Sequence, residues 1–449
     1  MMNIVIFAAG QGTRMKSNRP KTLQNVAGVA ILRRILNATL PLKPEKIVVI
    51  CGFKANQMID FLKNDKVICA IQKEQKGTAD ALLTAFPFID KNAPTLALVG
   101  DVPLISSDSL KRLAQTAGNS ALSLLTAKVE NPFGYGRIVR DENGNVLKIV
   151  EEKDADCAQK QIKEINTGMM VIPPSLLPFV EKIGTHNAQK EQYLTDIVAI
   201  AIHQKIPVRA SLLEDSMEGE GVNDKIALAK MERLIQSRQV ENLMKNGVTF
   251  ADPNRFDLRG TLKHGSDVFI DIGVILEGNC VFSDNVEIGA YCVLKNVKIA
   301  KNVRILPFTH IENATIGENA SVGPFARLRP DTVLENDVHV GNFVEIKKST
   351  LGKNTKAGHL SYLGDAEIGQ SVNIGAGTIT CNYDGKKKHK TTIQNGAFIG
   401  SDTQLVAPVE VGENALIAAG TTLTKNAPPH SLTHSRSQQK SFKKNENPR

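Results

Sequence analysis

An aliphatic residue returns about every sixth position between Ile270 and Leu423, and this period constrains the fold more than any other feature. The clearest runs are Ile316, Val322, Leu328, Leu334, Val340 and Ile346, and then Ile393, Ile399, Leu405, Val411, Ile417 and Leu423. A period of six fits neither an amphipathic helix nor a simple strand pair. It is typical of a parallel β-helix in which three hexapeptides form one triangular coil with the aliphatic side chains inside. We expect this β-helix to run from about Val248 to Lys425.

Glycine often follows the aliphatic residue directly. The positions are Gly289, Gly317, Gly323, Gly341, Gly369 and Gly400. We expect these glycines to occupy the tight corners of the coils. The repeat contains four five-residue steps, and one insertion of about seven residues lies between Thr380 and Ile393. Cys280 and Cys292 fall on the small inward position of two repeats, which predicts a packing role for them.

The first half of the chain has a different sequence pattern, because apolar strand-like runs alternate with stretches long enough for helices. The predicted strands are Asn3–Phe7, Lys46–Ile50, Val67–Ile71, Thr95–Val99, Ala121–Ala127 and Met169–Ile172, and the predicted helices include Ile31–Thr39, Ala55–Leu62 and Thr78–Ala85. This alternation predicts an open, mainly parallel α/β sheet. Ligands bind such sheets at the carboxyl ends of the strands.

A helix is predicted between the two halves. Asn223-Asp224 can cap its start, and Asn246-Gly247 can end it. We therefore expect an α/β domain over residues 1–223, a linker helix over 224–247, and the β-helix with a basic tail over 248–449.

Composition narrows the class of protein. The chain has 449 residues, of which 42% are hydrophobic and 22% charged, and no apolar run approaches the roughly 20 residues of a membrane span. Its six cysteines form no CxxC pair, which favours free thiols in a reducing cytoplasm. The net charge of +9 is concentrated at Lys386–Lys390 and in the tail from Arg436. Neither stretch is interleaved with aromatics, so we expect phosphorylated small molecules as partners and no nucleic acid.

A glycine loop follows the first predicted strand. It reads Gly10-Gln11-Gly12-Thr13-Arg14-Met15, and Lys21 lies shortly after it. Its backbone amides can face phosphate oxygens, while Arg14 and Lys21 add positive charge. The motif is neither a Rossmann fingerprint nor a P-loop, and by itself it is equally well explained as a tight turn.

Further polar residues follow other strands at the same expected edge. Asp101 comes after the run Thr95–Val99, Gln72 and Gly77-Thr78 come after another run, and Asn223 precedes the linker helix. Asp101 alone is more often a turn cap. Together with Asn223, however, it offers the oxygen ligands that suit Mg²⁺ between phosphates.

Position within the hexapeptide predicts which side chains of the β-helix point outward. His359, Ala376, Ser401 and Ala419 each lie two residues after an aliphatic, so we expect them to stack on successive coils over about 14 Å. Arg329 and Lys347 should form a basic pair one coil apart, suited to a phosphate. We expect Tyr362 and Asn373 to flank the same region. The insertion, with Asn382, Tyr383 and Lys388, is expected to fold over the groove.

The glycine loop with Pro20-Lys21 resembles the signature of sugar-1-phosphate nucleotidylyltransferases. Joined to hexapeptide repeats, nearly all of the chain apart from the tail resembles the family of bifunctional N-acetylglucosamine-1-phosphate uridylyltransferases/glucosamine-1-phosphate N-acetyltransferases. The resemblance implies a Rossmann-like, mostly parallel α/β nucleotidyltransferase domain followed by a left-handed parallel β-helix. It also implies a homotrimer, and a UDP-N-acetylglucosamine product for bacterial cell-wall precursors.

The resemblance implies a nucleotide-sugar site for UTP, N-acetylglucosamine-1-phosphate and Mg²⁺. Its residues would be Phe7, Ala8, Ala9, Gly10, Lys21, Gln72, Gly77, Thr78, Val99, Gly100, Asp101, Gly136, Glu151, Asn166 and Asn223. Arg14 and Lys21 would be catalytic, and Asp101 and Asn223 would hold the metal. The chain departs from the family at Phe7 (usually Leu), Val99 (usually Tyr) and Asp80 (usually His).

The resemblance also implies a second site for glucosamine-1-phosphate and acetyl-CoA. His359 would accept the proton of the attacking amine. Sugar-phosphate contacts would come from Arg329, Lys347, Tyr362, Asn373 and Lys388, and acetyl-CoA contacts from Ala376, Asn382, Tyr383, Ser401, Ala419 and Arg436. Two alternatives remain: a single-activity sugar-1-phosphate nucleotidylyltransferase with a β-helix used only for oligomerisation, and a regulatory scaffold with a degenerate nucleotide fold.

Overall fold

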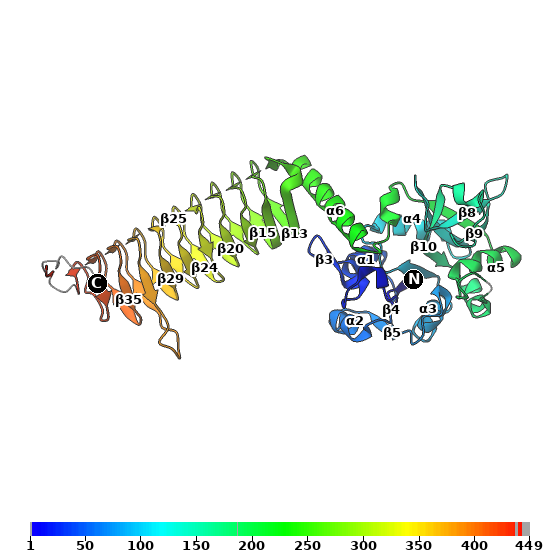
Figure 1. The fold of residues 1–449 in the computed structure, drawn as a ribbon, viewed down its shortest axis with the longest axis horizontal. Coiled ribbons are helices and arrows are strands. Elements are labelled where there is room, and N and C mark those ends of the chain that lie inside the picture. The colour runs from blue at the N-terminus through cyan, green and yellow to red at the C-terminus, as the bar shows by residue number, and fades with distance from the viewer. Residues whose placement is uncertain (1, 186, 436–438, 442–449) are drawn as a thin grey trace, which may run out of the picture. The chain divides into compact units, whose positions relative to one another are not determined.

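The chain divides into two compact units, Met1–Ile235 and Gln236–Arg449. They are taken from a computed structural model that describes residues 2–185, 187–435 and 439–441 (Figure 1). Within the part of the chain so described, no helix is both long and apolar enough to cross a membrane.

The first unit is built on one central sheet with the strand order β11-β7-β10-β6-β1-β4-β5, from which β8 and β9 branch at β10. The strand bounds are β1 (Asn3–Phe7), β4 (Lys46–Cys51), β5 (Ile68–Ile71), β6 (Thr95–Val99), β7 (Leu122–Lys128), β8 (Gly136–Arg140), β9 (Val146–Val150), β10 (Glu164–Ile172) and β11 (Val208–Leu212). Strands β1, β4, β5 and β6 run parallel, whereas β10 is antiparallel to both of its main neighbours. The predicted α/β class is confirmed.

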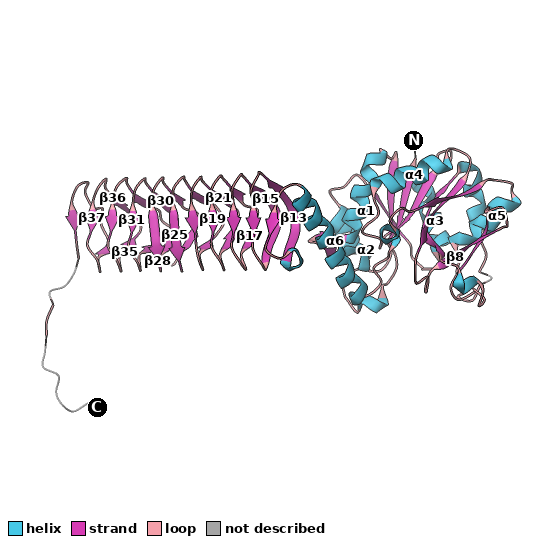
Figure 2. Cartoon of the chain, turned by 90° about the horizontal axis from the view of Figure 1, so that it is seen from above, coloured by secondary structure: helices cyan, strands magenta, loops and turns pink. Residues whose placement is uncertain are grey.

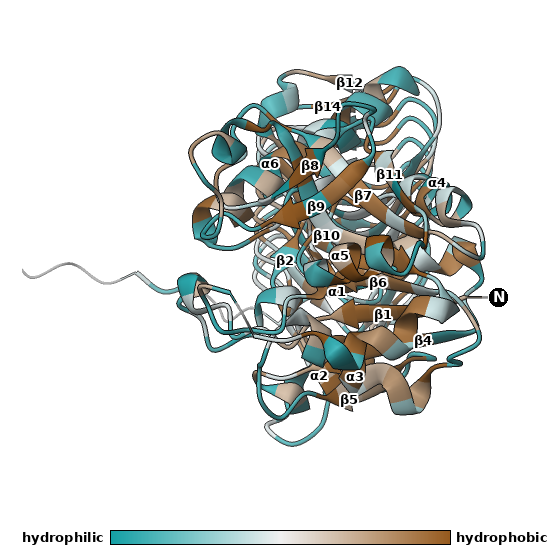
Figure 3. Cartoon of the chain, turned by 90° about the vertical axis from the view of Figure 1, so that its right-hand side faces the viewer, coloured by the Kyte–Doolittle hydropathy of each residue, from teal (hydrophilic) through white to brown (hydrophobic). Residues whose placement is uncertain are grey.

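Helices pack on this sheet because their apolar sides face its strands. Figure 3 shows the strands of the sheet coloured largely as hydrophobic. They are α1 (Ile31–Thr39), α2 (Ala55–Leu62), α3 (Thr78–Ala85), α4 (Ser107–Ala117) and α5 (Ile197–His203), with a small hairpin of β2 (Asn25–Val26) and β3 (Val29–Ala30) before α1. The bounds of α1, α2, α3, β1 and β6 agree with the sequence predictions. The carboxyl ends of β1, β4, β5 and β6 therefore form one edge.

Helix α6 (Lys225–Lys245) leads into the second unit. Asp224 caps it as predicted, since its Oδ1 accepts a hydrogen bond from the backbone N–H of Ala227 at 2.8 Å. Gly247 follows the end of the helix with φ at +99°, a conformation that glycine adopts easily. Gln236 fixes the helix to the second unit by two hydrogen bonds with the backbone of Leu258, at 2.8 and 3.1 Å.

The second unit is a parallel β-helix in which each regular coil adds three short strands (Figure 2). One strand of each coil joins an 11-stranded sheet that covers one side of the prism, which we call the single-face sheet. Its members are β12 (Thr249–Phe250), β14 (Phe269–Ile270), β16 (Glu287–Ile288), β19 (Arg304–Ile305), β22 (Ser321–Val322), β25 (His339–Asn342), β28 (Lys356–His359), β31 (Asn373–Ile374), β34 (Phe398–Ile399), β37 (Leu416–Ile417) and β39 (Leu432–Thr433). The predicted left-handed hexapeptide fold is confirmed.

The other two strands of each coil join the double-face sheet, which covers the two remaining sides of the prism. Its members are β13 (Phe256–His264), β15 (Val274–Phe282), β17 (Val293–Lys295), β18 (Lys298–Ile299), β20 (His310–Glu312), β21 (Ala314–Ile316), β23 (Arg327–Leu328), β24 (Thr332–Leu334), β26 (Glu345–Lys347), β27 (Thr350–Leu351), β29 (Tyr362–Gly364), β30 (Ala366–Ile368), β32 (Ile379–Cys381), β33 (Thr391–Ile393), β35 (Gln404–Val406), β36 (Val409–Val411) and β38 (Thr422–Leu423).

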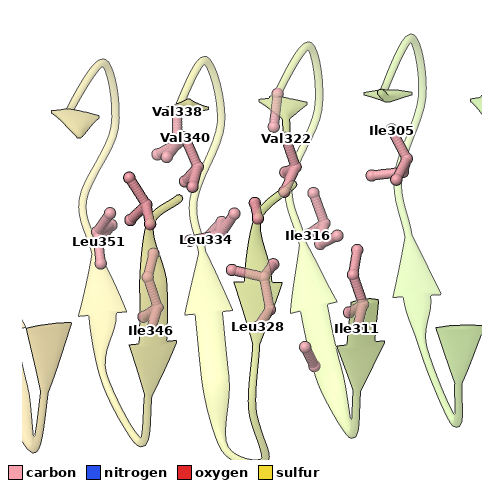
Figure 4. Close-up of a cluster of buried hydrophobic side chains, with 14 of the residues drawn as sticks. Ile305, Ile311, Ile316, Val322, Leu328, Leu334, Val338, Val340, Ile346 and Leu351 are labelled. Carbon is pink, nitrogen blue, oxygen red and sulfur yellow. The ribbon is translucent and has the colours of Figure 1, made fainter. Parts of the chain in front are cut away.

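The repeating aliphatic residues stack inside the prism as predicted (Figure 4). Leu328, Leu334 and Ile346 are at most 1% exposed, and the small residues that follow in each repeat fill the space between them. Cys280 and Cys292 are buried in the same core, which confirms their packing role. Burying apolar area in this way contributes about 25 cal/mol per Å² to the stability of the folded unit.

Two details of the predicted β-helix are wrong. It does not end at Lys425, because β39 adds a further strand beside β37 after a link that contains Pro428-Pro429 and lacks the six-residue spacing. The glycines mostly do not form the corners: only Gly323 of the predicted set has a positive φ. Glycine is needed for a different reason at Gly400, where an added Cβ would lie 2.4 Å from the backbone nitrogen of Ala419 on the next coil.

Left-handed corner positions are occupied by other residues, and the three edges of the prism differ. Two edges carry mainly Asn and Asp, for example Asn285, Asn302 and Asn319, whose side chains form a hydrogen-bonded ladder at 2.9 to 3.0 Å. The third carries Tyr291, Phe308, Phe325 and Phe343, which we call the aromatic edge. Its rings stack at 4.9 to 5.5 Å between centroids and are 44 to 55% exposed.

Candidate functional site

A cavity of about 240 Å³ lies in the first unit at the carboxyl ends of β1 and β6. Eight predicted residues line it: Phe7, Thr78, Val99, Asp101, Gly136, Glu151, Asn166 and Asn223. Tyr135, Thr167, Leu194 and Thr195 line it as well, although the sequence analysis did not single them out. The parallel strands β1 and β6 bring Phe7, Val99 and Asp101 together, as expected for an open α/β sheet. Gly136, Glu151 and Asn166 reach the cavity from the antiparallel strands β8, β9 and β10.

Three charged or amide side chains converge at one end of this cavity. Lys21 Nζ contacts Asp101 Oδ2 in an ion pair and lies 3.1 Å from Asn223 Oδ1. The two oxygens therefore face one point from different loops. A carboxylate and an amide oxygen fit Mg²⁺, and substrate phosphates can complete its coordination. Among the described residues no group of three or more His, Cys, Asp or Glu side chains could hold a metal.

The glycine loop leaves space beside this point. An atom added at Gly10 would meet nothing within 4 Å, and Gly12 has φ at +58°. Gly100 donates a backbone hydrogen bond to the carbonyl of Phe7 at 2.9 Å, which holds the ends of β1 and β6 together. Ala8 and Ala9 follow β1 and are buried. Arg14 is exposed in the 3-10 turn Thr13–Met15, outside the set of cavity-lining residues.

The loop after β5 carries the second group of predicted residues. Gln72 is 5% exposed, and its Nε2 donates to Asp80 Oδ2 at 2.7 Å and to the carbonyl of Gly77 at 3.3 Å. Gly77 packs so closely on Gln192 that an added Cβ would lie 2.4 Å from its carbonyl oxygen. The hydroxyl of Thr78 accepts a hydrogen bond from the N–H of Leu194 at 2.9 Å.

The other end of the cavity carries Glu151, Asn166 and Val99. Burial raises the pKa of Glu151, and the hydroxyl of Thr195, which donates to Oε1 at 3.1 Å, opposes that shift. Asn166 accepts a hydrogen bond from the N–H of Gly168 at 3.2 Å. The side chain of Val99 lies over Gly168, where an added Cβ would be 2.9 Å away. A carboxyl group and an amide at this end can bind the hydroxyl and amide groups of a sugar.

The predicted ladder on the β-helix has the expected register. Val340, Ala357, Ile374, Ile399 and Ile417 pair in succession, so the residues two places after the last four share one column. That column is His359, Ala376, Ser401 and Ala419. His359 is exposed, and its Nδ1 lies 2.9 Å from Oδ1 of Asn342, the residue paired with it on the preceding coil.

A group of cations lies on the neighbouring face of the prism. Arg329 Nη1 pairs with Glu345 Oε1 at 2.9 Å, and Lys347 follows on the next coil. Lys388 of the insertion contacts Lys347 and lowers its pKa, with burial adding to the effect. Asn382 Nδ2 donates to Asp365 Oδ2 at 2.6 Å. A Cβ added to Gly364 would lie 2.4 Å from the hydroxyl of Tyr362 and 2.8 Å from Asn382, so these side chains meet over that glycine.

Two expectations about this site are wrong within a single chain. Tyr362 and Asn373 do not flank one region, because Tyr362 belongs to the double-face sheet and Asn373 lies in the single-face sheet beside Lys356. The insertion does not fold over the ladder. It forms a hairpin closed by a bridge between Tyr383 and Lys388, which extends from the β-helix after β32 (Figure 1).

The remaining predicted position, Arg436, lies outside the described residues. Beside Lys388 is a cavity of about 460 Å³, lined by Asp331, Lys348, Ser349, Thr350, Asp365, Ala366, Glu367, Lys388, His389 and Lys390. The sequence analysis singled out neither Asn342 nor Asp365. A signal for Asn342 was present, because it lies 17 residues before His359, one short coil away.

Comparison with known proteins agrees with both halves of this description. A family model for the MobA-like NTP transferase domain matches residues 4–166, one for the GMPPB C-terminal domain matches 259–351, and one for the bacterial transferase hexapeptide (six repeats) matches 390–425. The "Bifunctional protein GlmU" of Dechloromonas aromatica (strain RCB) is 51% identical over 98% of this chain and 97% of its own length. The protein of the same name from Acinetobacter baumannii (strain AYE) is 46% identical over 97% of this chain and 96% of its own.

Proposed function

Since the chain belongs to the bifunctional GlmU family and is therefore a bifunctional transferase of UDP-N-acetylglucosamine synthesis, we propose how its residues divide the two reactions. The chain acetylates glucosamine-1-phosphate from acetyl-CoA and then transfers uridylyl from UTP to N-acetylglucosamine-1-phosphate. The alternatives of a single-activity enzyme and of a non-enzymatic scaffold are set aside. In our proposal residues 1–223 carry uridylyl transfer, 224–247 form a linker helix, and 248–449 carry acetyl transfer.

For uridylyl transfer, a phosphate oxygen of the sugar phosphate attacks the α-phosphorus of UTP and pyrophosphate leaves. The protein positions the two phosphates and stabilises the charge that develops. Amides of the glycine loop and the cations Arg14 and Lys21 face the phosphates. Asp101 and Asn223 would hold Mg²⁺, which supplies charge neutralisation when bound. The observation that carries this assignment is the convergence of Lys21, Asp101 and Asn223 at one point.

The metal assignment is tested with Asp101→Asn, which keeps the size of the side chain and removes its charge. We expect the Mg²⁺ concentration for half-maximal pyrophosphate release to rise about tenfold or more. Asp108→Asn, at an exposed carboxylate of α4, is the matched control and should leave the required Mg²⁺ concentration unchanged. An unchanged magnesium requirement in Asp101→Asn would remove this residue from the metal site.

For acetyl transfer, we propose that His359 accepts the proton as the amine attacks the thioester carbonyl of acetyl-CoA, and that coenzyme A leaves. Asn342 orients the imidazole through its hydrogen bond to Nδ1, which leaves Nε2 for the amine. Arg329, Lys347 and Lys388 form a site for the sugar phosphate. Ala376, Ser401 and Ala419 leave the column beyond His359 free of large side chains, as an extended ligand such as acetyl-CoA requires.

We propose that the protein is a homotrimer in which neighbouring β-helices complete the acetyl-transfer site. The separation of Asn373 from Tyr362 supports this, because the sugar-phosphate residues do not meet within one chain. The aromatic edge also supports it. A left-handed conformation costs roughly 1–2 kcal/mol for most residues, and the Asn and Asp of the other edges adopt it more easily. Exposed aromatic rings at such positions are typical of an interface.

The trimer is tested with Phe343→Asn and the control Val333→Asn, which changes an exposed apolar residue on another face. We expect the mass of Phe343→Asn in light scattering to fall toward the monomer on dilution, with acetyl transfer falling in parallel. A trimer of unchanged stability would place the interface elsewhere.

We propose a cytoplasmic location, supported by the free state of Cys51, Cys69 and the other described cysteines. The proposed small-molecule partners are UTP, acetyl-CoA and the two sugar phosphates. Nucleic acid is not among them.

A further inference from the structure

We infer that Asp80 is a positioning residue that fixes the side-chain amide of Gln72 and so makes the uridylyl-transfer site prefer uracil to cytosine. The inference rests on the proposed function of the first unit and adds to it that Gln72, one of the expected nucleotide-sugar site residues, faces the nucleotide base. It concerns one of the three positions at which the sequence analysis finds a departure from the family that the chain resembles.

Gln72 lies at the ligand-binding edge of the sheet. It follows β5 directly, and its backbone N–H donates to the carbonyl of Cys51 at 2.9 Å. Strand β1, which β4 separates from β5, ends at Phe7, so Ala8 and Ala9 follow at the same edge. Close packing holds this edge, because an atom added at Gly52 would lie 2.5 Å from the carbonyl oxygen of Ala9.

Two acceptors hold one end of the Gln72 side chain. Its amide lies 2.7 Å from Asp80 Oδ2 and 3.3 Å from the carbonyl oxygen of Gly77. An ionised carboxylate and a backbone carbonyl accept hydrogen bonds and donate none. Only the NH₂ group of Gln72 can face both of them. A flipped amide would bring its oxygen against two other oxygens and leave the half-buried carboxylate of Asp80 without this donor, which is unfavourable.

The fixed amide therefore turns its oxygen, Oε1, away from Asp80. An acceptor at this position suits uracil, whose N3 carries a hydrogen. It opposes cytosine, whose N3 carries a lone pair at the same place. A site built to accept a hydrogen bond rejects an analogue that lacks the donor, because its buried acceptor stays unpaired. Gln72 alone does not discriminate in this way, since a free amide can flip and present its NH₂ group to cytosine.

The test is a comparison of Asp80→Asn with the wild-type chain. Asn has the same size but can donate through Nδ2, so it permits the flipped amide of Gln72. We measure kcat/KM for UTP and for CTP with N-acetylglucosamine-1-phosphate, and acetyl transfer and thermal unfolding on the same preparations. Asp60→Asn, at an exposed carboxylate of the neighbouring helix α2, is the matched control for loss of one charge.

We expect the ratio of UTP to CTP efficiency to fall about tenfold in Asp80→Asn and to stay unchanged in Asp60→Asn. Acetyl transfer should be unaffected in both. An unchanged ratio in Asp80→Asn overturns the inference, including the case in which both efficiencies fall equally because the variant is only destabilised. Absence of UTP-dependent activity in the wild type would instead overturn the proposed function on which the inference rests.

Discussion

A methyl group added at Gly341 has no room in the β-helix, whereas the same addition at Gly358 meets open space. The two glycines occupy the same position on successive coils, since each follows one member of the pair Val340 and Ala357. A Cβ at Gly341 would lie 1.9 Å from the carbonyl oxygen of Gly358, while ordinary contact begins at 3.4 Å. The obstacle is backbone of the next coil, so it cannot turn aside as a side chain would.

Gly341→Ala must therefore separate two coils or twist the strand that carries Asn342. We expect a loss of about 3 kcal/mol or more, at or above the upper end of what overpacking usually costs. For a unit of this size that lowers the midpoint of thermal unfolding by about 6–12 °C. Gly358→Ala removes the same freedom from the unfolded chain without a clash, so its stability should be equal or slightly higher.

The assay is scanning calorimetry of both full-length variants, in which the transition of the β-helix is followed separately from that of the first unit. Equal midpoints for Gly341→Ala and Gly358→Ala would refute the stacking of coils described above. A fall for both variants would mean that glycine is needed at this position for a reason other than the next coil.

Two further predictions concern the sites. Burial raises the pKa of Glu151 in the folded state, so the stability that this group contributes below its unfolded pKa is lost as pH rises through the higher folded value. Glu151→Gln should therefore stabilise the first unit at about pH 8 and not at about pH 4, as measured by urea unfolding, and a pH-independent difference would contradict this. Lys347→Met should raise the KM for glucosamine-1-phosphate about tenfold or more, whereas Lys298→Met, at an exposed position of β18, should leave it unchanged. An equal effect of both lysine changes would point to general charge and not to a site.

Regular elements were predictable because their signals are local. The bounds of α1 and β6 follow from apolar runs that end at Gly, Pro or polar residues, and the coil register follows from counting six-residue steps. The role of the glycines after the aliphatic residues was not predictable in this way. Whether Gly400 forms a corner or avoids a clash depends on the distance to Ala419, which is one whole coil later in the chain.

The candidate sites were predictable where one repeat or strand end fixes the direction of a side chain, as for His359. They were not predictable where a partner comes from a distant loop. The hydroxyl of Thr195 reaches Glu151 only because the loop before α5 packs beside α3, and the bond from Gln72 to Asp80 depends on how the chain turns between them. The spacing of these residues along the sequence does not predict that their side chains form these hydrogen bonds.

The claim that two separate sites carry the two reactions is tested by measuring both reactions in Asp101→Ala and His359→Ala. The account predicts that Asp101→Ala loses UTP-dependent pyrophosphate release by about a hundredfold or more while acetyl transfer to glucosamine-1-phosphate persists. For His359→Ala it predicts that acetyl transfer is lost while UTP-dependent pyrophosphate release persists. Loss of both reactions in either folded variant, or full acetyl transfer by His359→Ala, would contradict it.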